Sequence, residues 1–448
     1  MRPIVNIKSK TFNITDKLIG AGSFSLVKVA YKKGDKTPIA LKICHCNSET
    51  EWLQSLNEIC LLKKLLHRNI VQMNNFEVTR FHVLIGLNKG EATLTQFIRK
   101  RSQEELRIYV IPIMSQIINA LNFIHGFHIV HGDIKTNNIL YIFHQDQLLI
   151  QIMDFGLSHV VGKADDEISS NDAGGTKAYL APERLFHLSY DETVDLFSAG
   201  IIFFELLFKN HPYYKEGHNY VNYMKNKPDP KFPHGYKSQV PKEWLSVLCS
   251  MLSYNPNNRN EVRNNDLLKT TYPEDTVQAD NQVIAIQNIY EAESAEQNKK
   301  YADAALLFLQ ASINIEIACH ETENKDLILE LNQRIAFLKK KVPALIHLFK
   351  HSYSDHDSSE PTIHDEYYDY LMEASASSPN VKQYLEIGYL GELYYRECKK
   401  DIAFKQFMDA LQYLNRVMPS EPAGDRKTII GRKMLQWTYM AEHLKSNT

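Results

Sequence analysis

The chain lacks a charge imbalance of either sign. Its 448 residues include 51 lysines and arginines against 53 aspartates and glutamates, which gives a formal net charge of −2. Such a chain has no general electrostatic field that attracts polyanions, so nucleic acid or anionic lipid would need a local basic patch. We therefore expect no nucleic-acid partner.

The cysteine pattern of a disulfide-stabilised protein is missing too. The six cysteines form neither a C-x-x-C pair nor a spaced framework. They are Cys44, Cys46, Cys60, Cys249, Cys319 and Cys398. This pattern indicates a reducing compartment.

Long apolar runs are also scarce. Residues Met1–Lys17 contain no apolar segment of the signal-peptide type, and the most apolar run, Leu196–Phe208, is too short for a bilayer and contains Glu205. We expect a cytoplasmic protein without direct membrane insertion. The apolar content of 44% is enough for sizeable cores, and the length suggests about two to four domains.

A polar stretch between two apolar runs, His131–Asn138, concentrates chemical groups. It offers Asp133 as a proton acceptor, Lys135 as a phosphate-binding cation and Asn138 as a metal ligand. The stretch resembles the catalytic loop H-R-D-x-x-x-x-N of protein kinases, with Gly132 where arginine is usual.

A glycine-rich turn lies near the amino terminus. Alternating apolar and polar residues predict a strand on each side of it. The turn consists of Gly20, Ala21, Gly22 and Ser23. Its glycines let backbone N–H groups approach phosphates, and Val27 follows on the second strand. Because Ser25 stands where the kinase motif has its third glycine, a plain hairpin turn remains an alternative.

A lysine and a glutamate follow at the spacing typical of kinases. Ile39–Lys42 resembles the strand motif V-A-I-K, so Ala40 and Lys42 are assigned to the nucleotide site. Glu58 is the expected partner of Lys42, since the segment Trp52–Leu66 has apolar residues at helical spacing. The alternative is that both residues lie on the surface of unconnected elements.

The apolar run Leu148–Met153 predicts a buried strand that ends at Asp154-Phe155-Gly156, which resembles D-F-G. The resemblance implies that Asp154 and Asn138 hold Mg²⁺, that Asp133 accepts the proton of the substrate hydroxyl, and that Lys135 neutralises the transferring phosphoryl group.

Three later charged residues complete the kinase pattern. Glu183 ends Gly175–Glu183, which resembles G-T-x-x-Y-x-A-P-E, and we expect it to pair with Arg259 because an unpaired buried charge is costly. Asp195 belongs to a helix that is apolar nearly all round. In the family, such an aspartate hydrogen-bonds the catalytic loop from beneath.

Together these motifs resemble the protein kinase family over residues 12–270. The resemblance implies a bilobal α+β kinase fold, ATP and Mg²⁺ as cofactors, and a protein substrate. Lys135 together with Thr176 favours serine/threonine over tyrosine specificity.

The missing arginine at Gly132 bears on regulation. In most family members this arginine pairs with a phosphate on the activation segment. We therefore expect activity to depend little on phosphorylation of Ser169, Ser170 or Thr176.

Two related helical blocks follow, at residues 280–350 and 380–446. They align at a constant offset of ninety-nine residues. The aligned pairs are Tyr290 with Tyr389, Glu293 with Glu392, Ala304 with Ala403, Phe308 with Phe407, Ala311 with Ala410, and Ile315 with Leu414. The small residues indicate tight helix contacts. A tetratricopeptide unit has two helices, whereas each block contains three, so both blocks resemble all-α MIT domains instead.

The segment between the blocks, residues 351–379, is acidic, rich in serine and contains neither lysine nor arginine. We expect a flexible linker. The alternative is that Tyr367–Met372 forms an amphipathic motif that docks onto a partner or onto the chain's own bundle.

A kinase followed by two MIT-like units resembles the Unc-51-like kinase family. The resemblance implies binding to the carboxyl-terminal tails of ESCRT-III subunits or to autophagy-initiation subunits, and recruitment from the cytoplasm to endosomal, autophagic or midbody membranes. A pseudokinase scaffold is the competing interpretation, favoured by Ser25 and Gly132.

Overall fold

The computed structural model divides into two compact units. The larger contains residues 11–13 and 30–353, and the smaller contains residues 1–10, 14–29 and 354–448. The residues described are 9–21, 25–46, 48–79, 82–144, 147–161, 176–213, 220–269, 280–352, 371, 375, 378–396, 400–420 and 425–446.

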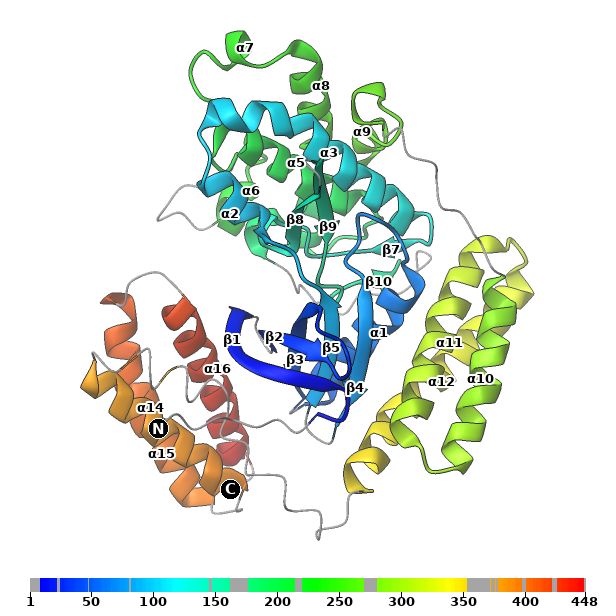
Figure 1. The fold of residues 1–448 in the computed structure, drawn as a ribbon, viewed down its shortest axis with the longest axis vertical. Helices are drawn as coiled ribbons and strands as arrows, with labels where there is room; N and C mark the ends of the chain where they lie inside the picture. The colour runs from blue at the N-terminus through cyan, green and yellow to red at the C-terminus, as the bar shows by residue number, and fades with distance from the viewer. Residues whose placement is uncertain are drawn as a thin grey trace. The chain divides into compact units, whose positions relative to one another are not determined.

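An antiparallel sheet and one long helix open the larger unit (Figure 1). The strands β3 (Pro38–His45), β5 (His82–Asn88) and β4 (Met73–Val78) are neighbours in that order. The register sets Lys42 opposite Ile85. Because residues directly opposite on antiparallel strands share a face, Ile85 lies on the same face of the sheet as Lys42.

Helix α1 (Glu49–Lys64) begins at a capping box formed by Ser48 and Glu51. The predicted segment, Trp52–Leu66, runs two residues past the observed end of the helix, and its placement of Leu66 at helical spacing is wrong. The helix ends at Lys64, so Leu66 leaves the helical register and is 60% exposed.

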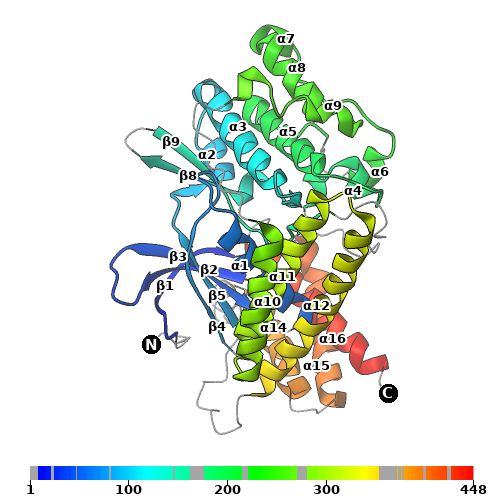
Figure 2. The same cartoon turned by 90° about the vertical axis from the view of Figure 1, so that its right-hand side faces the viewer.

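A mainly helical lobe follows (Figure 2). Its central helices are α3 (Gln103–His125) and α5 (Thr193–Phe208), and nearly every residue of α5 is buried, as its composition predicts. The other elements are β6 (Ala92–Thr93), α2 (Leu94–Arg99), β7 (Ile129–Val130), η1 (Thr136–Asn138), β8 (Ile139–His144), β9 (Gln147–Ile152), β10 (His159–Val160), η2 (Lys177–Tyr179), α4 (Pro182–Leu185), α6 (Tyr220–Met224), α7 (Tyr236–Gln239), α8 (Lys242–Met251), α9 (Pro256–Asn260) and η3 (Asp266–Leu268).

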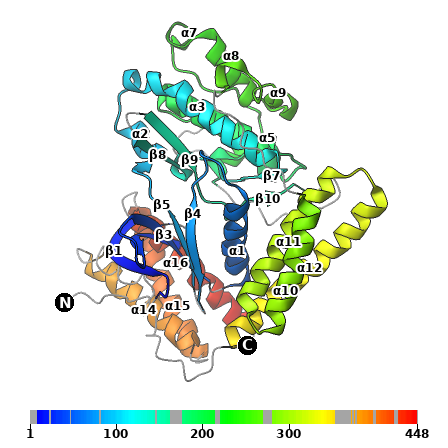
Figure 3. The ribbon, with the colours of Figure 1, turned by 45° about the vertical axis from the view of Figure 1, so that its right-hand side comes forward.

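Three helices complete the larger unit: α10 (Asn281–Gln297), α11 (Tyr301–Glu321) and α12 (Lys325–His351). We call them the first bundle, and Figure 3 shows them side by side next to α1. The sequence predicts that the third helix ends near Val342. It instead continues through Pro343 to His351, and its last turn contacts α1.

Two helices of the larger unit, α3 and α11, are long and apolar enough to cross a membrane by length and composition alone. Within the most apolar stretch of each helix, 61% of the residues in α3 and 67% of those in α11 are buried inside the protein. Burial in the cores of the helical lobe and the first bundle therefore explains why these two helices are so apolar.

The smaller unit contains β1 (Phe12–Ala21), β2 (Ser25–Lys32) and three helices, α14 (Pro379–Arg396), α15 (Lys400–Val417) and α16 (Asp425–Ser446), with a short η5 (Met418–Ser420) between the last two. We call α14 to α16 the second bundle. Leu371, from the segment predicted as a linker, lies fully buried in its core.

A buried polar group links α14 to α16. Glu392 is 4% exposed and accepts hydrogen bonds from Lys433 Nζ at 3.0 Å and Trp437 Nε1 at 2.6 Å. The two helices approach closely at Gly388, where an added Cβ would stand 2.2 Å from the Trp437 ring. The Gly388 position therefore needs the smallest residue.

Candidate active site

Three charged side chains meet where the sheet and the helical lobe adjoin. Lys42 Nζ from β3 donates to both carboxylate oxygens of Glu58 from α1, at 2.8 and 2.6 Å, and to Asp154 Oδ1 at 2.7 Å. The predicted pairing of Lys42 with Glu58 is therefore present. The alternative of two unconnected surface residues is wrong.

The carboxylates favour the ionised form of Lys42 and Lys42 favours that of Asp154, whereas burial raises the pKa of Glu58. Burial alone would lower the pKa of Lys42, but the carboxylates of Asp154 and Glu58 outweigh it and hold that pKa well above its usual range. The Lys42 charge lowers the pKa of Asp154 although burial opposes it. A charged lysine is what a phosphate-binding position requires.

The catalytic-loop residues form one hydrogen-bonded group. Lys135 Nζ donates to Asp133 Oδ2 at 2.6 Å, and Asn138 Nδ2 donates to the same oxygen at 2.9 Å. Thr176 donates to Asp133 Oδ1 through its backbone N–H at 3.0 Å. The Asp133 side chain is only 9% exposed, so these three partners fix the direction of its carboxylate.

Asp195 holds the catalytic loop from below, as the resemblance implies. Its Oδ2 accepts the His131 N–H at 2.8 Å, and its Oδ1 accepts the Gly132 N–H at 3.0 Å. His125 Nε2 lies 3.0 Å from Oδ2. Two backbone donors on one buried carboxylate constrain the loop against rotation.

The structure gives Gly132 a partner that the sequence analysis missed. Gly132 has φ of +79°, and an added Cβ would stand 3.2 Å from Arg184 Nη1 and 3.2 Å from the Leu157 carbonyl oxygen. Arg184, itself buried, donates to the Gly132 carbonyl. An arginine thus does approach this loop, from the residue that follows Ala181-Pro182-Glu183.

The predicted pairing of Glu183 with Arg259 is confirmed. Arg259 is fully buried, and its Nη1 and Nη2 donate to the two Glu183 oxygens, at 2.5 and 3.1 Å. This bidentate geometry compensates the loss of hydration of both charges. The pair fixes α4 to α9 beneath the site.

Part of the predicted nucleotide site lies on the sheet of the larger unit. Ala40 is buried on β3, and the β3–β5 register assigns Ile85, fully buried, to the face of Lys42. Ile85, rather than Gly86, therefore lies on the face of the sheet that carries Lys42.

The predicted glycine-rich turn is described only in part. Gly20, Ala21 and Val27 belong to the smaller unit, and Gly22 and Ser23 lie outside the described residues. Ser169 and Ser170 also lie outside them.

The donor set suits a hard divalent cation. Asp154 offers a carboxylate, of which Lys42 engages only Oδ1, and Asn138 offers an amide oxygen while its Nδ2 donates to Asp133. Magnesium prefers oxygen ligands and completes its shell with phosphate and water. Asp154 and Asn138 therefore fit as the residues that would hold Mg²⁺ beside a nucleotide.

Two further site residues escaped the sequence analysis. The Tyr179 hydroxyl donates to Glu205, at 2.8 Å to each oxygen, and burial raises the pKa of Glu205 to about 7. Both residues occur inside segments that were assigned to other motifs. Only the fold brings them together, so sequence spacing carried no signal for them.

A family model described as protein kinase domain matches residues 14–272. This match covers more than half of the chain, and it includes every motif residue from Gly20 to Arg259. The chain therefore belongs to the protein kinase domain family.

The chain is similar to several named kinases over about half of its length. Myosin light chain kinase A from Dictyostelium discoideum is 29% identical over 239 residues, 52% of this chain and 79% of that protein. A probable myosin light chain kinase from the same organism is 31% identical over 250 residues, 54% of this chain and 78% of that protein. Calcium/calmodulin-dependent protein kinase type 1 from Macrobrachium nipponense is 35% identical over 207 residues, 45% of this chain and 58% of that protein.

Proposed function

We propose that this chain is an active serine/threonine protein kinase that transfers the γ-phosphate of ATP to hydroxyl groups of protein substrates. One observation carries the proposal: Lys42 is paired with Glu58 and Asp154 while the Asp133 carboxylate is held by its loop. A phosphoryl-transfer site needs a lysine for the phosphates of ATP and a carboxylate for the proton of the hydroxyl, and Lys42 and Asp133 offer these two groups.

Each residue has a definite task in this reaction. Asp133 accepts the proton of the attacking hydroxyl, and Lys135 neutralises charge on the transferring group. Lys42 orients the phosphates of ATP. Asp154 and Asn138 would hold Mg²⁺, which supplies positive charge beside the phosphates when it is bound.

Transfer of radiolabelled phosphate from ATP to protein tests this proposal. We expect the full chain to label serine and threonine, and Asp154→Ala to lose at least about a hundredfold in rate because the metal ligand is gone. Asp266→Ala is the matched control, since Asp266 is an exposed carboxylate far along the chain whose side chain is 91% exposed. Equal labelling by wild type and Asp154→Ala would contradict the proposal.

The contact between Arg184 and Gly132 supports the expectation that activation-segment phosphorylation matters little. In this chain the guanidinium near the catalytic loop is engaged by the Gly132 carbonyl, whereas a phosphate-dependent switch needs a free basic group. Phosphatase treatment should therefore leave the rate within about twofold. A large loss that rephosphorylation reverses would show the opposite.

We further propose that the two bundles are MIT-like and place the kinase in the Unc-51-like family. The support is that each bundle has three helices and that the repeated alanines and one repeated phenylalanine occupy its core. Helical bundles of this kind bind amphipathic helices in surface grooves. The occupants we expect are ESCRT-III tails or autophagy-initiation subunits, at endosomal, autophagic or midbody membranes.

Binding of ESCRT-III tail peptides to the full chain tests this recruitment. Saturable binding that Phe407→Ala weakens, with no change from the exposed-site variant Leu435→Ala, is expected because Phe407 supports the second bundle while Leu435 is 72% exposed. Failure to bind any tail would favour the autophagy-initiation subunit.

A pseudokinase scaffold is the competing function, and Ser25 and Gly132 are the residues that favour it. A catalytically silent scaffold predicts the same phosphate incorporation in wild type and Asp154→Ala, so the transfer assay separates the two functions.

A further inference from the structure

The first bundle packs directly on α1, the helix that carries Glu58. Lys64 Nζ, in the last turn of α1, donates to Asn281 Oδ1 at 2.7 Å and to Asn314 Oδ1 at 2.9 Å. Both asparagines are at most 4% exposed. A lysine that reaches two buried amides marks a specific contact, because each group left alone would be costly to bury.

The contact extends along the whole of α1. In its middle, the Cys60 thiol lies 3.6 Å from the Leu306 carbonyl oxygen of α11. Near its start, the Trp52 ring is 1% exposed and packs edge-on against Phe349 of α12, with centroids 5.8 Å apart. A buried tryptophan that packs on another aromatic ring stabilises the contact between the elements that carry the two rings. The last turn of α12, beyond Pro343, therefore serves to cover Trp52.

The same bundle also reaches the helical lobe. The His320 ring of α11 stacks on His128, with centroids 4.3 Å apart, and its Nε2 donates to the Val161 carbonyl. Val161 directly follows β10, and Asn57 of α1 donates to the Ser158 carbonyl just before it, at 2.8 Å. The first bundle thus holds α1 and the segment after Asp154 at once.

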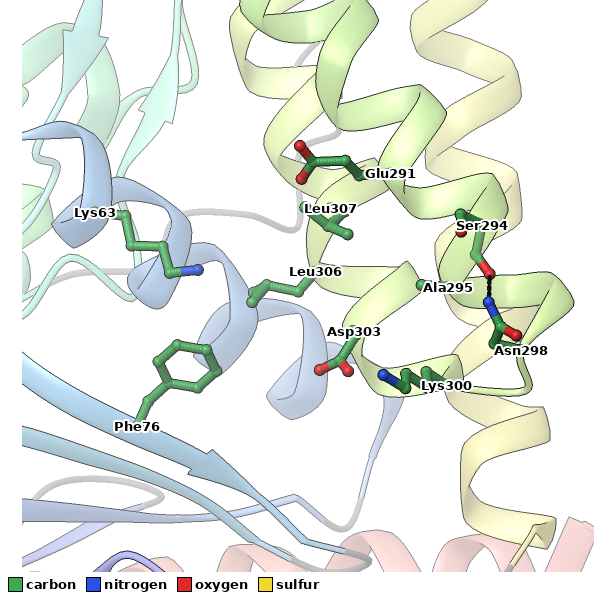
Figure 4. Close-up of a pocket in the computed structure, with 10 residues that line it drawn as sticks. All are labelled: Lys63, Phe76, Glu291, Ser294, Ala295, Asn298, Lys300, Asp303, Leu306 and Leu307. Carbon is green, nitrogen blue, oxygen red and sulfur yellow. Dashed lines mark hydrogen bonds between the residues drawn. The ribbon is translucent and has the colours of Figure 1, made fainter.

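A cleft runs beside this contact. Figure 4 shows Lys63 and Phe76 on one side and Leu306 on the other, around a cavity of about 380 Å³. Side chains that line a void have no packing partners across it. The contact between α1 and the first bundle is therefore incomplete at this edge.

We propose that the first bundle is a built-in activator that keeps α1 in the position where Glu58 binds Lys42. The inference deepens the proposed kinase function and rests on it. Its direction follows from the geometry, because Lys42, Glu58 and Asp154 are paired while the bundle is seated on α1. Release of the bundle frees α1 and lowers the rate of transfer.

A charge-swap cycle at Lys64 and Asn314 tests this activator in the full chain. Asn314→Lys brings a second ammonium group next to Lys64 Nζ and should expel α1 from the bundle. Lys64→Glu combined with Asn314→Lys restores an attractive pair. Leu329→Lys is the matched control, because it adds the same charge to α12 at a site that is 61% exposed.

We expect Asn314→Lys to lower kcat/KM about tenfold and to raise hydrogen exchange in α1, and the double variant to restore both within about threefold. Leu329→Lys should change neither. A rise in kcat/KM would show an inhibitory bundle and overturn the proposal. Unchanged kcat/KM with increased exchange, or unchanged exchange in Asn314→Lys, would overturn it as well.

The exchange measurement does not depend on catalysis. A wild-type chain that transfers no phosphate would defeat the proposed kinase function, whereas an active chain insensitive to Asn314→Lys would defeat only the activator.

Discussion

The two bundles bury the same side chains on their middle helices. At aligned positions of α11 and α15, two alanines and one phenylalanine are at most 1% exposed in each bundle. They are Ala304, Phe308 and Ala311 in the first bundle, and Ala403, Phe407 and Ala410 in the second. The repeat therefore preserves a tight helix–helix contact, as expected from the small residues.

The first helices of the two bundles differ. Tyr290 is 76% exposed on α10 and Glu293 is exposed, whereas the aligned Tyr389 packs edge-on against Trp437 and the aligned Glu392 is buried. The two bundles thus share the core of their middle helices but differ in the packing of their first helices. The first bundle uses α11 and α12 to hold α1, while the second closes α14 against α16 around a buried charge.

The offset of ninety-nine also pairs Gly388 with Ile289 and Trp437 with Leu338. The second bundle packs the smallest residue close to the largest, whereas the aligned residues of the first bundle are both of middle size. Packing at constant volume permits such exchanges between related cores.

Truncation of the shared phenylalanine should give the largest effect. We expect Phe308→Ala and Phe407→Ala each to destabilise their bundle by roughly 3–5 kcal/mol because each leaves a cavity. Hydrogen exchange of the bundle helices measures it. Only Phe308→Ala should also lower the rate of phosphate transfer. An equal loss of rate in Phe407→Ala would contradict the proposed difference between the two bundles.

The second largest effect should come from removal of Lys433, the charge partner of Glu392 in the second bundle. Lys433→Met leaves Glu392 buried without its cation and should cost about 3 kcal/mol. Arg334→Met, at the aligned and exposed position of the first bundle, should cost less than about 0.5 kcal/mol. Denaturant unfolding of both variants measures the difference, and equal costs would contradict the account.

The close approach of α14 and α16 gives a smaller effect. Gly388→Ala should destabilise the second bundle by roughly 2 kcal/mol, since its Cβ meets the Trp437 ring. Trp437→Leu introduces the residue type of the aligned Leu338 in the first bundle. The smaller side chain should reduce the cost of Gly388→Ala in the double variant. Additive losses in a double-mutant cycle would show that the two positions do not couple.

The smallest predicted effect is a pH dependence confined to the first bundle. Burial lowers the pKa of Lys64, although Glu321 opposes this. The seated α1 therefore binds its proton less tightly than the free helix does, so the contact strengthens as pH rises towards the ordinary lysine pKa. We expect a small gain in protection of α1 from hydrogen exchange, absent in Lys64→Met and in the second bundle.

The motif residues of the catalytic loop and the Glu183–Arg259 pair were predictable because each follows a local pattern whose chemistry is restrictive. Phe308 and Phe407 were predictable for a related reason, since a repeat shows which face is buried. Leu66 was mispredicted because periodicity does not locate the turn at which a helix ends.

Other contacts left no trace in sequence spacing. Arg184 reaches Gly132, Tyr179 reaches Glu205 and Lys64 reaches Asn314 only through the tertiary fold. Each of these residues reads alone as an ordinary surface or core residue. Their roles depend on which elements the chain packs together, and a one-dimensional pattern does not contain that information.

The most direct test of the account is phosphate transfer by the full chain compared with Asp133→Asn. The substitution keeps the size of the side chain and its place beside Lys135 but removes the proton acceptor. We predict measurable transfer by the wild type and a loss of roughly 10²–10⁴-fold in kcat for Asp133→Asn. Equal rates in the two proteins would contradict the central claim that this site catalyses phosphoryl transfer.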